Sequence, residues 1–334
     1  MPGSTRGSAL SDVLSSEVTP PAESAADDAE GLVESVSPGR LAFRRYLRHR
    51  AALVCTIIFL VIVFFVVFAP FTARYGVTQG VKLHKVAYNS PRGAAWFGTD
   101  DLNRDIYSRL LWGGRISLFI GISVALVGSL VGTLVGAYAG YRGGKIDDLL
   151  MRTTDVFLAF PFLVALLVIR NLLGSQKWVT DLLGDKTSIR FMVVLLSVLS
   201  WPFVARLVRG QVLSLKEKEF VESARALGAK DRRILIQHIL PNCFGPIMVA
   251  TSNAVVGAIV AESTLSFFGF GVQPGEGKTS WGLMVADAKG AVTSGFWWVA
   301  LFPCLTLVVT VLCVNFIGDG LRDAFDPKQS RGRA

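Results

Sequence analysis

Apolar residues in this chain are concentrated in six long runs that are separated by polar segments. A helix needs about 20 apolar residues to cross roughly 30 Å of hydrocarbon, because each residue adds about 1.5 Å. The six runs have close to that length and cover residues 51–69, 116–140, 156–173, 191–208, 244–268 and 296–317. The pattern predicts an all-α integral membrane protein with six transmembrane helices.

Composition supports this class. The 334 residues are 51% hydrophobic with a mean hydropathy of +0.49, and only 18% are charged, against roughly 25% in ordinary globular proteins. The net charge of +9 could suggest nucleic acid as a partner. In a chain with six spans, however, Lys and Arg first indicate the cytoplasmic side of the membrane. We therefore expect contact with membrane lipid and no nucleic-acid partner.

The distribution of basic residues predicts the topology. Five arginines between residues 40 and 50 lie directly before the first run, which places the N-terminus in the cytoplasm, and six crossings return the C-terminus to the same side. The loop between the fourth and fifth runs is then also cytoplasmic, and it is strongly basic. One outer segment, residues 71–115, runs against the rule because it contains Arg74, Lys82, Lys85, Arg92, Arg104, Arg109 and Arg115.

The same pattern divides the chain into regions. Residues 1–39 are rich in Ser, Ala, Pro, Asp and Glu without an apolar run, which predicts a disordered acidic cytoplasmic tail. Residues 40–115 hold the first span and the outer segment. Residues 116–318 form the core of the membrane domain with a cytoplasmic loop at 209–243, and residues 319–334 form a cytoplasmic C-terminal tail.

Within the membrane runs, two features indicate special packing or function. Glycines recur every four residues in the second run, so they line one helix face and predict close approach of another helix; they are Gly128, Gly132, Gly136 and Gly140. Glu262 is an acid in a membrane segment and therefore a candidate gate or pore residue. Arg170 lies near an outer helix end and could snorkel to water or pair with Glu262.

The cytoplasmic loop contains a helix, a glycine and a second amphipathic stretch. Phe220, Ala224 and Leu227 fall at positions i, i+4 and i+7 and predict the apolar face of a short helix. Gly228 then allows a sharp turn, and Pro241 is expected to end the second stretch before the fifth span. The loop could offer an apolar knob to a cytoplasmic protein, or it could lie on anionic lipid.

Catalysis and nucleotide binding by this chain are not expected. The Gly-Lys-Thr triplet in "GVQPGEGKTS" (residues 271–280) lacks the upstream glycine of a P-loop, since Val272 occupies that position, so we interpret it as a surface loop. The cysteines have no metal-ligand spacing, and His49, His84 and His238 form no HExxH pair. No nucleophile and base stand at the spacing of a known catalytic motif.

One segment resembles a known family. "ESARALGAKDRRILIQHILP" resembles the EAA motif of ABC-importer permeases, with matches at Glu222, Ser223, Ala224, Gly228, Leu240 and Pro241. Ser223 replaces the usual second Ala. The stretches "WFGTDDLNRDIYSRLLWGGRISL" and "AESTLSFFGFGVQP" narrow the resemblance to the C-type permease subunit of dipeptide and oligopeptide importers, although Asn103 stands where glycine is usual. The resemblance covers residues 40–327.

The resemblance implies a type I ABC-importer (MetI-like) permease fold in the cell inner membrane. It implies a heterodimer with a B-type permease, two ABC ATPase subunits that bind ATP and Mg, and an extracytoplasmic peptide-binding protein; this chain itself holds no cofactor. The resemblance implies that residues 222–228 form a coupling helix. Its docking face then consists of Phe220, Ala224 and Leu227, and Glu222 serves as a polar anchor. A nickel or other small-solute importer, and an ion-coupled secondary transporter, remain as alternatives.

Overall fold

The computed structural model describes residues 38–81, 87–185, 187–273 and 279–325. The chain forms two units, Met1–Leu41 and Ala42–Ala334. The described part of the first unit is the beginning of helix α2 (Pro38–Arg48), so helix starts inside the region predicted as a tail. The remainder of that tail lies outside the described residues. The same holds for His84 and for Gly277 and Lys278 of the Gly-Lys-Thr triplet.

Five described helical stretches are long and apolar enough to cross a membrane. They are α3 (Arg50–Val67), α5 (Ile106–Arg142), α9 (Ile189–Leu215), the continuous path Asp231–Phe267, and α14 (Trp298–Phe325). A sixth crossing results if a bent helix pair counts as one span. The helices extend past several predicted ends: α5 begins ten residues earlier than the apolar run, and α14 continues into the region predicted as the C-terminal tail.

The third predicted span, residues 156–173, is not one continuous helix but falls on a bent helix pair. Helices α6 (Gly144–Ala159) and α7 (Phe162–Gly174) meet at an angle of 96°. Phe160 is extended with ψ 138°, because the ring of a following proline clashes with a helical conformation of the preceding residue. Pro161 therefore breaks the span instead of only bending it.

Pro241 does not end the helix before the fifth span, so that prediction is wrong. The chain stays helical from α11 (Asp231–Arg233) through the π-helix η1 (Ile234–Ile239) and the 3₁₀ turn η2 (Leu240–Cys243) into α12 (Phe244–Phe267). Proline removes one backbone donor from an α-helix. A change of hydrogen-bond pattern on both sides of Pro241 accommodates that loss without leaving the helical path.

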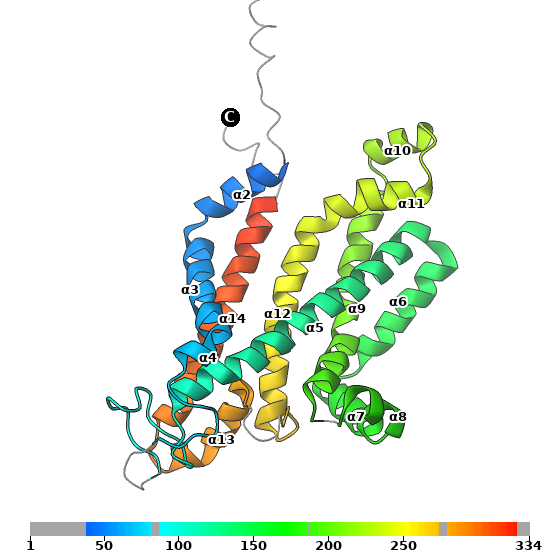
Figure 1. Ribbon diagram of the computed structural model, residues 1–334. Coiled ribbons are helices and arrows are strands. Elements are labelled where there is room, and N and C mark those ends of the chain that lie inside the picture. Colours follow the sequence, from blue (N-terminus) through cyan, green and yellow to red (C-terminus); the bar gives the residue numbers. More distant parts are fainter. Residues whose placement is uncertain (1–37, 82–86, 186, 274–278, 326–334) are drawn as a thin grey trace, which may run out of the picture. The chain divides into compact units, whose positions relative to one another are not determined.

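Short helices lie at both ends of the second unit (Figure 1). Helix α10 (Glu219–Ala226) projects at one end together with α11. At the opposite end lie α4 (Ala69–Thr72), α7, α8 (Lys177–Leu183) and α13 (Trp281–Thr293). The long helices α5, α9, α12 and α14 run between the two ends, so each one links them mechanically.

The glycine row of α5 lies against α9, its most extensive helix contact. A Cβ added at Gly132 would lie 2.6 Å from the Trp201 carbonyl oxygen, and one added at Gly140 would lie 2.9 Å from the Arg209 carbonyl oxygen. A Cβ at Gly136 would clash with the Ala205 carbonyl oxygen, and one at Gly128 would clash with the Ser200 hydroxyl of the same helix. Because backbone atoms fill the space that a side chain would need, only glycine permits this helix separation.

Candidate functional site

The projecting end of the second unit forms an elbow, which we define as residues 219–239. Helix α10 ends at Ala226, and Gly228 follows with φ 80°. No atom lies within 4 Å of a Cβ added at Gly228, so the requirement for glycine comes from the left-handed backbone and not from crowding. At the tip, the Leu227 side chain is 88% exposed, and Phe220 is 39% exposed. The elbow therefore presents two large apolar side chains to its surroundings.

The underside of the elbow is a packed apolar cluster. Val221 and Ala224 of α10 are buried and pack with Ile234 and Ile239 of η1 and with Val212 of α9. The predicted docking face is therefore wrong at Ala224, because residues 221 and 224 lie three apart and share the face that turns toward the bundle. Phe220 and Leu227 remain outside, and the elbow is held as one unit on the end of α9.

The other motif residues occupy different surroundings. Glu222 is exposed, and no described side chain pairs with its carboxylate. Ser223 donates its hydroxyl to the Glu219 carbonyl oxygen at 2.9 Å within α10. Leu240 packs at the edge of the buried cluster, whereas Pro241 is exposed. Two bonds tie the elbow region to α5: Tyr141 donates to Asp231 at 2.8 Å, and Lys216 donates to the Gly140 carbonyl oxygen at 3.3 Å.

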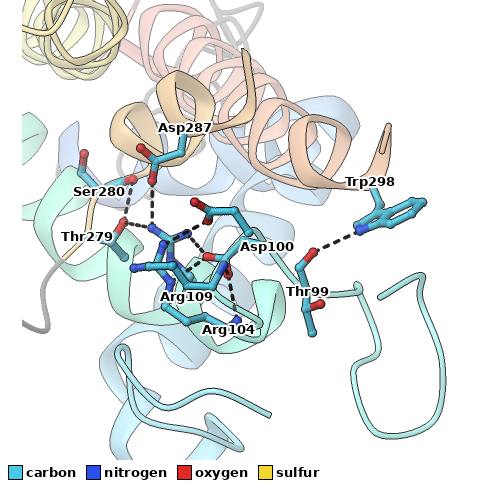
Figure 2. A network of polar contacts seen from close by, with 10 residues as sticks. Thr99, Asp100, Arg104, Arg109, Thr279, Ser280, Asp287 and Trp298 are labelled. Carbon is cyan, nitrogen blue, oxygen red and sulfur yellow. Dashed lines mark hydrogen bonds and ion pairs between the residues drawn. The ribbon is translucent and has the colours of Figure 1, made fainter. Parts of the chain in front are cut away.

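A buried ionic network lies at the opposite end, in what we call the cap: residues 87–105 together with α13. Figure 2 shows the Arg109 guanidinium between two carboxylates, at 2.5 Å from Asp100 and 3.1 Å from Asp287 of α13. Arg104 donates to Asp100 at 2.7 Å, and Arg109 also reaches the Thr279 hydroxyl at 3.4 Å. The network joins the loop before α5, the first turn of α5 and α13.

Two further features shape the loop of the cap. Asp105 caps α5 by accepting from the Ser108 backbone N–H at 2.9 Å, and burial, its largest influence, raises the pKa of the Asp105 carboxyl. Asn103 adopts φ 58° and donates to the Val81 carbonyl oxygen at 2.7 Å. Asparagine tolerates this left-handed conformation better than most residues, so the turn forms without the glycine that is usual at that position.

Glu262 and Arg170 have different contacts in the structure. Glu262 is fully buried and accepts hydrogen bonds from Ser280 at 2.8 Å and Ser266 at 2.9 Å. Arg170 is 4% exposed, and its guanidinium lies 5.5 Å from the ring centre of Phe270. Among the described side chains there is no ion pair between Arg170 and Glu262, so the alternative of a pair between them is not realised in this structure.

An apolar cavity of about 540 Å³ opens between helices α5, α6, α7, α9 and α12. Its walls are mostly apolar and include Leu158, Phe162 and Phe203. Asn253 and Thr264 of α12 add polar groups to the lining. The cavity accommodates a flexible organic solute or the side chains of another membrane helix by size.

Comparison with known proteins identifies the family. Residues 132–331 match the family described as binding-protein-dependent transport system inner membrane component. The chain belongs to this family. Residues 37–91 also match the N-terminal TM domain of oligopeptide transport permease C. The predicted resemblance is thereby confirmed, and the chain is a permease component of an ABC importer.

Relatives match over nearly the whole permease. The dipeptide transport system permease protein DppC of Bacillus subtilis (strain 168) is 38% identical over 298 residues, which cover 89% of this chain and 88% of that one. The oligopeptide transport system permease protein OppC of Escherichia coli (strain K12) is 39% identical over 296 residues, with 89% and 93% coverage.

A solved structure supports the fold. An inward-facing structure of the MetNI methionine ABC transporter (native crystal form) superposes with a TM-score of 0.55 at 19% identity, covering 66% of this chain and 98% of that one. The predicted all-α membrane architecture with a MetI-like permease fold is confirmed.

The ionic network of the cap was missed by sequence reasoning. The signal is present, because Asp100, Arg104 and Arg109 stand at i, i+4 and i+9 in the segment that precedes and begins α5. Asp287, by contrast, lies 178 residues from Arg109, and nothing in its local pattern indicates this partner.

Proposed function

We propose that the permease forms half of the translocation path of an importer for dipeptides or oligopeptides. Two relatives that carry peptide-transport names, DppC of Bacillus subtilis and OppC of Escherichia coli, are 38% and 39% identical over 89% of the chain. The cavity supports this proposal because its apolar wall, interrupted by Asn253 and Thr264, suits a peptide with mixed side chains. Import of nickel or another small solute is the alternative, and direct uptake measurements separate the two.

The observation that carries the coupling proposal is the exposed tip of the elbow. An 88% exposed leucine beside a glycine at φ 80° is costly in water and useful at an interface, because burying such a side chain gains about 1.5–3 kcal/mol. In our proposal Phe220 and Leu227 insert into an ATPase subunit. The rigid underside around Val221 and Ala224 then passes the movement to α9 and α12.

The remaining components follow from this role. A B-type permease packs beside the cavity, two ATPase subunits hold ATP and Mg, and a peptide-binding protein docks on the cap. This chain then catalyses no reaction. The elbow lies in the cytoplasm with both termini, in agreement with the basic residues of the loop. Thr279, the described residue of the Gly-Lys-Thr triplet, contacts Arg109 of the cap network, at the end where our proposal has no nucleotide.

The test compares two matched glycine variants in the complete transporter. Gly228→Ala forces alanine into a left-handed conformation, which costs about 1–2 kcal/mol. Gly210→Ala on α9 adds the same methyl group where no atom lies within 4 Å. Copurified ATPase should decrease about tenfold in the first variant and stay unchanged in the second.

Uptake into proteoliposomes completes the test. Labelled dipeptide and tripeptide should accumulate with ATP, and Ni²⁺ should not. If a second permease copurifies with the wild-type chain but no ATPase does, the proposal of an ATP-driven importer is wrong. If Ni²⁺ accumulates and peptides do not, the substrate class is wrong and the coupling role stands.

A further inference from the structure

Glu262 is a buried carboxylate whose partners are hydroxyl groups and not a cation. It is 0% exposed, and within the described part of the chain no Lys or Arg forms an ion pair with it. Three serines from three different segments donate to it: Ser280 at 2.8 Å, Ser266 at 2.9 Å and Ser117 at 3.4 Å. A carboxylate in a membrane helix is costly unless such donors surround it.

The N-terminus of α13 supplies the rest of the compensation. Ser280 is the N-cap of this 13-residue helix and accepts from the Leu283 N–H at 3.1 Å while it donates to Glu262. The partial positive charge at a helix N-terminus favours a nearby carboxylate. Gly282 allows this approach, because a Cβ at that position would lie 2.6 Å from Ser263 Cα and 3.2 Å from the Glu262 carboxylate.

Helix α5 is part of the same junction. Ser117 accepts from the Trp281 backbone N–H at 3.0 Å, and the Trp281 indole donates to the Leu110 carbonyl oxygen at 2.9 Å. Thr279, two residues before Trp281, contacts Arg109 of the ionic network (Figure 2). The first residues of α13 are therefore fixed to α12 through Glu262 and to α5 through Ser117 and Arg109.

The junction stands at one end of a helical path of 37 residues. That path begins at Asp231 in the elbow and continues without leaving a helical conformation to Phe267. Glu262 lies one and a half turns before its end. A displacement of α13 relative to the membrane helices is thus applied directly to the helix that begins at the elbow, and the buried hydrogen bonds keep α13 from sliding independently.

We propose that Glu262 is a positioning residue that locks α13 to α12, so that docking of a binding protein on the cap is transmitted to the elbow. This inference rests on the proposed function. Without the Glu262 carboxylate, α13 still folds through its own hydrogen bonds and the Arg109–Asp287 pair, but it loses its fixed position on α12. The transporter then assembles and hydrolyses ATP at its basal rate, while the response to the binding protein decreases.

The experiment uses the complete transporter in lipid nanodiscs, with ATPase activity measured alone and with saturating peptide-loaded binding protein. Glu262→Gln keeps the side-chain volume and removes the charge. Asp319→Asn, at an exposed carboxyl on α14, is the matched control. We expect Glu262→Gln to reduce the stimulated-to-basal ratio at least threefold with basal activity within twofold of wild type, and Asp319→Asn to leave both unchanged.

Ser280→Ala and hydrogen exchange separate positioning from simple structural support. Ser280→Ala should also lower the stimulated-to-basal ratio. The double variant of Glu262→Gln and Ser280→Ala should lower it little further, because both changes affect the same Ser280–Glu262 hydrogen bond. Amide exchange should rise in residues 281–293 and stay unchanged in α9. Wild-type stimulation in Glu262→Gln, or a parallel loss of basal activity and assembly, overturns the proposal. If the wild-type complex shows no stimulation by any peptide-loaded binding protein, the importer function itself fails.

Discussion

Replacing Leu227 with alanine tests the coupling elbow most directly. The side chain is 88% exposed at the end of α10, and the buried cluster beneath the elbow does not include it. Surface substitutions of this kind change stability by about 0.5 kcal/mol or less. A change in the behaviour of Leu227→Ala can therefore be attributed to a contact outside this chain.

The size of the effect follows from the exposed surface. Full burial of a leucine side chain is worth about 1.5–3 kcal/mol, and at 88% exposure nearly all of that gain is still available for binding. Alanine retains only the Cβ. Each 1.4 kcal/mol corresponds to a factor of ten in the dissociation constant, so ATPase binding should weaken between about 10-fold and 150-fold.

The assay measures the affinity of purified ATPase subunits for the permease pair in nanodiscs by biolayer interferometry. Leu182→Ala is the matched control, because Leu182 is 68% exposed on α8 at the opposite end of the unit. The control should bind like wild type. Unchanged affinity in Leu227→Ala would refute the role of the elbow tip. An equal loss of ATPase affinity in both variants would show that the assay reports nonspecific hydrophobic binding.

Two further predictions concern packing and pH. Gly136→Ala brings a Cβ into a steric clash with the Ala205 carbonyl oxygen, and overpacking of this kind typically costs about 1–3 kcal/mol. The apparent Tm should fall by several degrees, while Gly210→Ala on open helix surface should leave it unchanged or higher. Burial raises the pKa of the Asp105 carboxyl above its ordinary 3.8, so the folded state favours the neutral carboxyl. The stability that Asp105 contributes is therefore present below pH 3.8 and is lost as the pH rises through the folded-state pKa. As the pH rises from 3.8 through the folded-state pKa, the apparent Tm of wild type should decline more steeply than that of Asp105→Asn. Equal slopes of Tm against pH in the two proteins would contradict a raised pKa at Asp105.

Much of the membrane architecture could be predicted because run length and local geometry are set by adjacent residues. Five of the six apolar runs correspond to continuous crossings, since a hydrocarbon core admits little other than long helices. Gly228 was predicted as a turn because few other residues adopt φ 80° without strain. The glycine row of α5 indicated a close neighbour, but only the structure identifies that neighbour as α9.

Where prediction failed, distant residues decided the outcome. The spacing of apolar residues in α10 is compatible with two helix faces, one with Phe220, Ala224 and Leu227 and one with Val221 and Ala224. The apolar residues of η1 and α9 determine that the second face is buried. The break at Pro161 was visible as a proline, but its 96° angle depends on how α7 packs against α9. A short sequence window contains neither partner.

The basic residues between 71 and 115 illustrate how tertiary pairing changes the meaning of a charge count. They ran against the expected topology, because outer segments usually carry few arginines. In the structure Arg104 and Arg109 are neutralised by Asp100 and Asp287, and Arg74 stacks 4.8 Å from the ring centre of Trp96. Because carboxylates pair with Arg104 and Arg109, these two residues add little net positive charge to the segment, whereas Arg74 keeps its charge against the indole ring. The segment is therefore compatible with an outer location, and its arginines act as structural ties of the cap on which the binding protein is proposed to dock.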